Sequence, residues 1–418
     1  MSMTITEKIF ARASDKKSVS PGEIVDAKID AAMVHDLTGP LAIHIFREIG
    51  VAKVWDPNKI VMVCDHQVPA NSIDAAQNHM VLRKFASEQK IQNFYDIFEG
   101  ICHQVVPEKG FALPGSLIVG ADSHTTTYGA LGCVSAGVGA TDMAAVFATG
   151  KLWFRVPESI KIVLEKKLPR RVMAKDVILK IIGDLGAEGA NYRSAEFTGP
   201  GMRNITMDGR MTMCNMGVEM GTKNAIVPPD EITEKYLAGR AKQHYSAVYS
   251  DPDAQYIEKH TYDLSELEPQ IACPHSVDNV KPIAEVGKIE INQAFLGSCT
   301  NGRMEDLEAA AAVLRGKKVS RRVRLIVSPA SRDIYRKALD EGLIKILVEA
   351  GALVEAPCCA ACMGAHVGVL GPGEVCISAS NRNFRGRQGS PESKVYLASP
   401  ATVAASAIRG VITDPRDV

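Results

Sequence analysis

The sequence has no excess of charge of either sign, and aromatic residues make up only 6% of it. Lysine plus arginine equals aspartate plus glutamate at 48 each, so the formal net charge is zero. A neutral chain has no overall field that would attract nucleic acid or an anionic membrane surface. The shortage of aromatics also argues against a surface on which bases stack. Any anionic ligand must therefore be held by local arginines.

Long apolar runs are also missing. The first 17 residues mix charges with short apolar steps, which does not fit a secretory signal. The least polar stretch, residues 132–150, consists of small side chains and contains Asp142, so we do not interpret it as a membrane span. We expect a cytoplasmic protein without membrane contact.

The length of 418 residues is too great for one compact core, whereas 46% apolar and 23% charged residues are ordinary for a soluble globular protein. Residues 156–175 become basic and β-rich, and residues 272–287 are rich in proline and polar side chains, which is typical of a linker. We predict three α/β domains, over residues 1–157, 158–280 and 281–418.

Short apolar runs alternate with helical patterns, and several runs end in a burst of polar residues. Continuous runs of Val, Ile and Leu favour strands that are buried on both faces, as in parallel sheets. In open parallel α/β sheets, ligands bind beyond the carboxyl ends of the strands. The predicted fold class is therefore α/β with parallel-rich sheets, and the polar bursts mark the candidate site.

Ten cysteines in a reducing compartment are free thiols or metal ligands, not disulfides. Burial among apolar neighbours accounts for four of them, Cys64, Cys133, Cys214 and Cys376. Cys359 and Cys362 differ, because a two-residue gap lets both thiolates reach one metal centre. The same spacing also occurs in redox motifs and in half of a zinc site.

A third cysteine, Cys299, follows a predicted strand and lies among loop-forming residues, so three thiolates can converge. A [4Fe-4S] cluster held by three cysteines leaves one iron open as a Lewis acid. Cys358 is interpreted as structural, because neighbouring side chains of an extended segment point to opposite sides. A structural zinc site would need a fourth ligand, and His366 keeps that alternative open.

Histidines and aspartates gather at other predicted strand ends. Asp65 precedes His66, and Asp122 lies two residues before His124. Dehydration of a hydroxy acid needs an acid for the departing hydroxide, and a histidine oriented by a carboxylate supplies one near neutral pH. A single histidine would more often be a satisfied core residue. Together with His103, however, the group favours catalysis.

A basic loop follows the last predicted strand, residues 374–379, and contains Asn381, Arg382 and Arg387. Arginine's rigid fork matches a carboxylate through two parallel hydrogen bonds. The alternative is an ordinary solvated loop. We interpret it as a clamp for a di- or tricarboxylate, because asparagines flank the arginines at a strand end.

These motifs together resemble the aconitase superfamily, and within it the large subunits of isopropylmalate dehydratases, over nearly the whole chain. The resemblance rests on seven ordered motifs: Asp65-His66, Gly100 to Gln104, Gly120 to Thr125, Cys214 to Glu219, Gly297 to Gly302, Cys359 to Gly364, and Ser380 to Arg387.

The resemblance implies three α/β/α domains around a [4Fe-4S] cluster bound by Cys299, Cys359 and Cys362. It implies that His66 with Asp65 is the acid, that His103 pairs with Asp122, and that Glu219 and His124 support the water at the cluster. It places His35, Ser123, Asn215, Asn381, Arg382 and Arg387 at the substrate. The implied reaction interconverts 2- and 3-isopropylmalate in leucine biosynthesis, with homoaconitase and 2,3-dimethylmalate dehydratase as rivals.

Single-chain relatives have a fourth domain that supplies the base, whereas this sequence ends at Val418. The resemblance therefore implies a separate small subunit in a heterodimer or heterotetramer, and a large subunit that is inactive alone. Some relatives bind RNA after losing the cluster, but neutral charge disfavours that role here.

Overall fold

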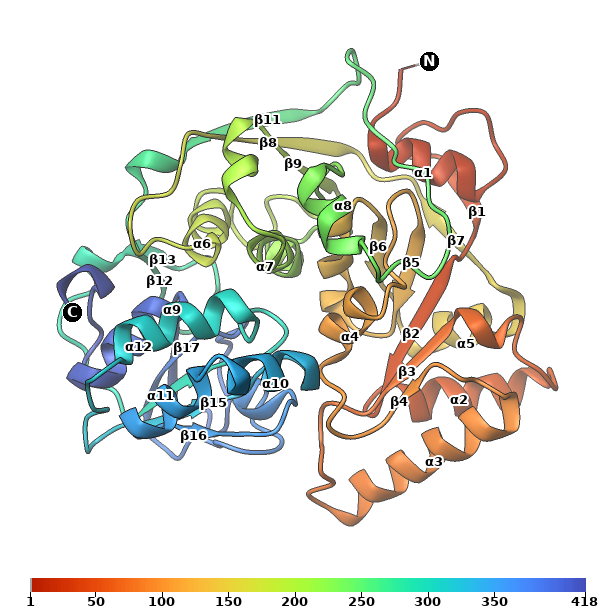
Figure 1. The fold of residues 1–418 in the computed structure, drawn as a ribbon. Coiled ribbons are helices and arrows are strands. Elements are labelled where there is room, and N and C mark those ends of the chain that lie inside the picture. The colour runs from red at the N-terminus through yellow and green to blue at the C-terminus, as the bar shows by residue number, and fades with distance from the viewer. Residues whose placement is uncertain (1) are drawn as a thin grey trace.

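The computed structural model describes residues 2–418, which form three larger sheets and one small antiparallel ribbon (Figure 1). The ribbon pairs β1 (Ile24–Lys28) with β7 (Lys151–Arg155). Every pairing in the first two larger sheets is parallel, as are most pairings in the third. The predicted α/β class with parallel-rich sheets is confirmed.

The first sheet has the strand order β4-β3-β2-β5-β6. Its strands are β2 (Ala31–His35), β3 (Ile60–Val63), β4 (Phe94–Tyr95), β5 (Leu117–Gly120) and β6 (Val134–Gly137). The helices of this part of the chain are α1 (Ile5–Ala13), α2 (Gly39–Ile49), α3 (Ile73–Gln89), α4 (Cys102–Glu108) and α5 (Ala140–Thr149). Every residue of β2, β3 and β5 is buried, which explains their unbroken apolar sequences.

The second sheet has the order β10-β9-β8-β11. Its strands are β8 (Ser159–Glu165), β9 (Ser194–Thr198), β10 (Asn224–Ile226) and β11 (Glu258–Asp263), and its helices are α6 (Ala174–Leu185), α7 (Met207–Gly217) and α8 (Glu231–Leu237). In Figure 1, α6 and α7 lie on the side of this sheet that faces the other two sheets.

The third sheet has the order β13-β12-β18-β17-β14-β15-β16. Its strands are β12 (Gln270–Ala272), β13 (Val280–Pro282), β14 (Gln293–Leu296), β15 (Arg324–Val327), β16 (Leu353–Val354), β17 (Val375–Ser378) and β18 (Lys394–Leu397). Its helices are α9 (Met304–Leu314), α10 (Arg332–Asp340), α11 (Leu343–Ala350) and α12 (Pro400–Arg409).

The segment predicted to be a linker, residues 272–287, is partly structured. Within it β13 pairs with β12, and β12 pairs antiparallel with β18, so residues 270–282 extend the edge of the third sheet. The interpretation as a linker was wrong for these residues, because their polar side chains belong to an edge ribbon. The three domain ranges themselves stay a prediction. Within residues 2–418, no helix combines the length and the apolarity needed to cross a membrane.

Candidate active site

The polar bursts predicted at strand ends meet in one region of the structure. From the first sheet, His35 ends β2, Asp65 and His66 follow β3, and Asp122 to His124 follow β5. From the third sheet, Cys299 follows β14 and Asn381 follows β17. The carboxyl ends of parallel strands from two sheets thus supply most of the site, as expected for this fold class.

A cavity of about 180 Å³ lies between these loops. Eleven of the predicted site residues line it: His35, His66, His103, Asp122, His124, Cys299, Cys359, Cys362, Asn381, Arg382 and Arg387. Three of the other four predicted residues lie directly behind the lining residues. Asp65 and Glu219 contact lining histidines, and Asn215 contacts Cys299. Ser123 lines a different cavity, next to Thr126 and Lys223.

The three predicted ligand thiols are all buried and open onto this cavity. Burial raises the pKa of Cys299 to about 12, so this thiol stays neutral unless a cation binds it. The contact between Cys359 and Cys362 raises the pKa of Cys359 and lowers that of Cys362. Three converging thiols of this kind are a donor set that fits a thiolate-bound metal centre.

Polar hydrogens point at the sulfur atoms. The amide Nδ2 of Asn215 lies 3.2 Å from Cys299 Sγ, and Asn381 Nδ2 lies 3.5 Å from the same sulfur. A guanidinium nitrogen of Arg387 lies 3.8 Å from Cys362 Sγ. Such donors stabilise thiolates more than neutral thiols, so the surroundings suit sulfur atoms that carry negative charge.

The alternative ligands, His366 and Cys358, do not line the cavity with the three thiols. His366 directs Nε2 to the carbonyl of Pro69 at 3.2 Å and does not line the cavity. The thiol of Cys358 is buried outside the lining, and its backbone carbonyl accepts a hydrogen bond from Ser328 Oγ at 2.9 Å. Cys64, Cys133, Cys214 and Cys376 are buried, as their apolar neighbours predicted.

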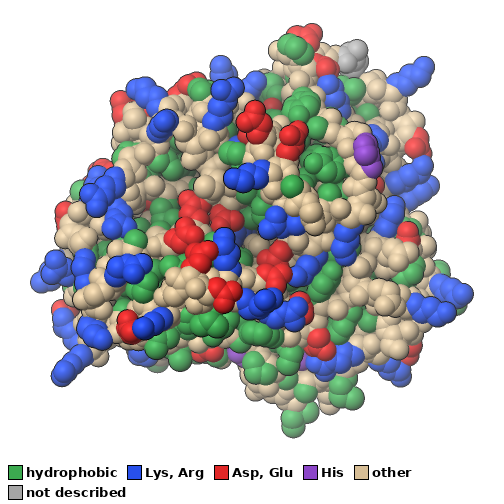
Figure 2. All heavy atoms as spheres, in the orientation of Figure 1, with side chains coloured by type: hydrophobic (Ala, Val, Ile, Leu, Met, Phe, Trp, Pro, Cys, Tyr) green, Lys and Arg blue, Asp and Glu red, His purple; other side chains and the backbone are tan. Residues whose placement is uncertain are grey.

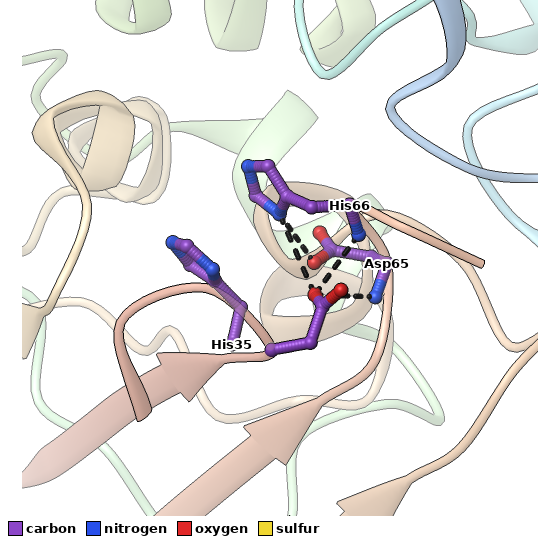
Figure 3. A group of neighbouring side chains, drawn as sticks. His35, Asp65 and His66 are labelled. Carbon is purple, nitrogen blue, oxygen red and sulfur yellow. Dashed lines mark hydrogen bonds and ion pairs between the residues drawn. The ribbon is translucent and has the colours of Figure 1, made fainter. Parts of the chain in front are cut away.

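His66 is held by carboxylates of the first sheet (Figure 3). Its Nδ1 lies 2.7 Å from Asp65 Oδ1, and its ring stacks on His35 with centroids 4.0 Å apart. Burial by itself would lower the pKa of His66, but the charges of Asp65 and Asp36 outweigh burial and raise it to about 10. His66 therefore carries a proton at neutral pH, which a general acid requires.

Asp36 fixes the turn that carries this pair. Its carboxylate accepts the backbone N–H groups of Asp65, His66 and Gln67 at 3.1, 3.0 and 2.8 Å. Burial disfavours this charge, but the hydrogen bond with His79 and the nearby imidazoles hold the pKa of Asp36 well below its usual range. Sequence reasoning passed over Asp36, although it directly follows His35 at a strand end.

His103 and Asp122 form a second pair. His103 Nε2 lies 2.7 Å from Asp122 Oδ1, and its Nδ1 lies 3.1 Å from the hydroxyl of Tyr128. Burial lowers the pKa of His103 despite the charge of Asp122, so this imidazole is neutral at pH 7. Among the histidines of the cavity, His66 is therefore protonated and His103 neutral, and each is oriented by an aspartate.

His124, Glu219 and Arg382 form the third group. A single oxygen, Glu219 Oε1, lies 2.8 Å from both His124 Nε2 and Arg382 Nε. Arg382 lines the cavity together with Arg387. Arg387 Nε is buried without a hydrogen-bond partner, which is costly unless a ligand accepts from it.

Two buried cations behind the cysteines escaped sequence reasoning. Arg303 donates to the carbonyls of Cys299 and Thr300 at 2.7 and 2.8 Å and to Gln104 Oε1 at 2.9 Å. Lys175 donates to carbonyls just before Asn381. The acceptors of Lys175, and Gln104 for Arg303, come from distant segments, so the local sequence does not distinguish either residue from a surface cation.

Known proteins match the whole length of the chain. The model of the aconitase family (aconitate hydratase) matches residues 7–288 and 279–410. A probable 3-isopropylmalate dehydratase large subunit of Methanothermobacter thermautotrophicus is 60% identical over 415 residues, covering 99% of each chain. A 3-isopropylmalate dehydratase large subunit of Methanopyrus kandleri is 56% identical over 416 residues, covering 100% of this chain and 99% of the relative.

A probable methanogen homoaconitase large subunit of Methanothermobacter thermautotrophicus is also 56% identical over 418 residues, covering 99% of this chain and 98% of the relative. Relatives named for two different substrates are thus nearly equally similar to this chain. The family model and these relatives cover the residues of the cavity described above. The chain belongs to the aconitase family.

Proposed function

We propose that this chain is the large subunit of a hydro-lyase that interconverts 2- and 3-isopropylmalate by dehydration and rehydration. One observation carries the proposal. Three buried thiols, a protonated histidine and two arginines line the same cavity. Thiols provide a metal centre, the histidine provides a proton, and the arginines bind carboxylates.

We propose that Cys299, Cys359 and Cys362 hold a [4Fe-4S] cluster. When bound, such a cluster supplies a Lewis acid that polarises a hydroxyl group, because three cysteines leave one iron without a protein ligand. The hydrogen bonds from Asn215 and Asn381 to Cys299 Sγ support this ligand set. Free thiols persist in a reducing compartment, which supports a cytoplasmic location.

In this proposal, different side chains of the cavity protonate, bind and position the substrate. His66, kept protonated by Asp65, donates its proton to the departing hydroxide. Arg382 and Arg387 bind the carboxylates of the substrate, and Glu219 keeps Arg382 in place through a 2.8 Å hydrogen bond. His35 stacks on His66 and limits the motion of its ring.

We propose that the partner is a separate small subunit, in a heterodimer or heterotetramer, and that it supplies the base for the Cα proton. The "large subunit" names of the relatives support a partner. RNA binding by the cluster-free form has less support, because acidic side chains intersperse the basic ones on the face shown in Figure 2. The three predicted domain ranges are retained in this proposal.

Homoaconitase is the second candidate, because the homoaconitase relative is as similar as one of the isopropylmalate dehydratases. The two proposals differ only in the substituent that the substrate carries. Purified large subunit, combined with the small subunit from the same source, should be assayed with isopropylmalate and with homocitrate. A higher kcat/KM for homocitrate would replace the first proposal with the second.

The cluster is tested by anaerobic reconstitution and by counting iron and sulfide per chain. Adjacent cysteines provide a matched pair, because Cys359→Ser removes a proposed ligand and Cys358→Ser changes a buried thiol outside the cavity. We expect about four irons in the wild type and in Cys358→Ser, and loss of cluster absorbance in Cys359→Ser. Zinc instead of iron in the wild type would overturn the proposal.

A further inference from the structure

Lys175 is a fully buried lysine that reaches from α6 to two loops of the third sheet. Its Nζ donates to the carbonyls of Ala379 and Ser380 at 2.8 and 2.6 Å, and it lies 3.4 Å from Asn301 Oδ1. Asn301 comes two residues after Cys299, and Ser380 directly precedes Asn381. One ammonium group therefore connects the loop of a proposed cluster ligand with the loop of a proposed substrate residue.

Burial lowers the pKa of Lys175 to about 7, because the protein itself compensates the charge of this ammonium group poorly. Its three nearest acceptors are neutral, and it forms no ion pair with a carboxylate of the described chain. It also lies in the first turn of α6, where the helix dipole disfavours a cation. A buried charge without a counter-charge costs several kcal/mol, so its presence needs an explanation.

The carboxylates that act on Lys175 are already engaged. Asp176 accepts the backbone N–H groups of Met173 and Gln270, and Asp306 accepts those of Arg303 and the side chain of Asn301. Burial raises the pKa of Asp176 to about 6 and that of Asp306 to about 7, so Asp306 is only partly ionised near neutral pH. Neither carboxylate forms an ion pair with Lys175 in the described chain. The other groups that would favour the charged form of Lys175 are Cys362 and Cys299, once both are thiolates.

We propose that Lys175 is the buried counter-charge of the thiolate-bound cluster and a positioning residue for the Cys299 and Asn381 loops. The inference rests on the proposed function, because it assumes the cluster. An oxidised four-iron core with three thiolates carries roughly one net negative charge, which one ammonium group balances. Lys175 then stabilises the chain with its cluster more than the chain without it.

Three variants separate charge from packing. Lys175→Met keeps most of the side-chain volume and removes the charge and the donors, whereas Lys175→Gln removes the charge but keeps an N–H donor. Lys180→Met is the matched control, since Lys180 is also on α6 but is 44% exposed and paired with Asp184. The cluster should be reconstituted anaerobically in every variant and in the wild type.

The readouts are the cluster's reduction potential, the rate of iron loss after mild oxidation, and the Tm of each chain with and without cluster. In both Lys175 variants we expect a more negative potential and roughly 10- to 100-fold weaker retention of iron, which is the usual effect of losing a group beside the ligands. The cluster should also raise Tm by less than in the wild type. Lys180→Met should match the wild type.

A potential and an iron retention equal to the wild type's in both variants would overturn the inference. The inference would also be overturned if both Lys175 variants lost the same Tm with and without cluster while the potential stayed unchanged. That is the result of a purely structural role. If Lys175→Met does not fold, the potential of Lys175→Gln decides. A wild-type chain that binds no cluster would instead refute the proposed function, and the two failures are thus distinguishable.

Discussion

Replacing Asp65 with asparagine tests whether this carboxylate keeps His66 protonated. Burial lowers the pKa of His66, and the charge and hydrogen bond of Asp65 are the largest contributions that raise it to about 10. Relative to an ordinary 6.5, this corresponds to about 5 kcal/mol in favour of the imidazolium, at about 1.36 kcal/mol per pH unit. Without the charge of Asp65, burial dominates, and we expect the pKa of His66 to fall below 7.

The assay is the pH dependence of kcat/KM for the complex with the small subunit. In the wild type, loss of the His66 proton should limit activity only near pH 10. In Asp65→Asn this alkaline limb should move below pH 7, so that activity at pH 8 falls by at least about 10-fold and recovers in part at pH 6. The matched control is Asp96→Asn, whose carboxylate pairs with Arg83 on the surface. A uniform loss at every pH, with the alkaline limb unchanged, would refute the reasoning.

The same interaction makes stability depend on pH. The pKa of His66 in the folded chain is higher than in the unfolded chain, so the interaction stabilises the fold fully below about pH 6.5. This contribution is lost as the pH rises towards 10. The difference in free energy of unfolding between the wild type and Asp65→Asn, measured in urea on the cluster-free chains, should therefore shrink between pH 6 and pH 10.

Three further substitutions have expected outcomes. Asp36→Asn removes the charged acceptor of three backbone N–H groups and should lower the free energy of unfolding by about 2–4 kcal/mol in urea titrations. Arg382→Lys cannot donate to Glu219 and to a carboxylate with the same fork, so KM should rise about 10- to 100-fold with a smaller change in Tm. Gly129→Ala would place Cβ 1.7 Å from the carbonyl oxygen of Ala225 and should lower the urea midpoint strongly, whereas Gly139→Ala, with its nearest neighbour at 3.8 Å, should not.

Much of the candidate site could be predicted, because short sequence patterns mark its residues. Parallel strands place their carboxyl ends along one edge of the sheet. Polar residues that follow each strand, such as His35, Asp65 and Asp122, are therefore expected to lie close together, as they do. The two-residue gap between Cys359 and Cys362 is a second short-range pattern, and it predicts two thiols at one metal centre. Such features depend on spacing within a few residues.

Residues 332–350 show that a single backbone conformation can divide a helical segment. Gly342 adopts a φ of +75° and ends the helical path, so the chain forms α10 and then a separate α11. The pairing of β12 with β18 was not predicted. It joins residues that are more than 100 positions apart, and β12, with only three residues, is too short to show a periodic pattern.

The roles of the buried cations could not be predicted either, because both have partners that lie far away in the sequence. Lys175 meets acceptors about 200 residues away, so its role depends entirely on tertiary structure. Carboxylates of the first sheet surround His66, whereas cations lie beside the loops of the third sheet that carry the thiols. In the proposed reaction His66 protonates the departing hydroxide, and the cations beside the third sheet stabilise the thiolates that would hold the cluster. Because the two groups belong to different sheets, substitutions that tune the proton donor should leave cluster retention unchanged, and those behind the thiols should leave the pKa of His66 unchanged.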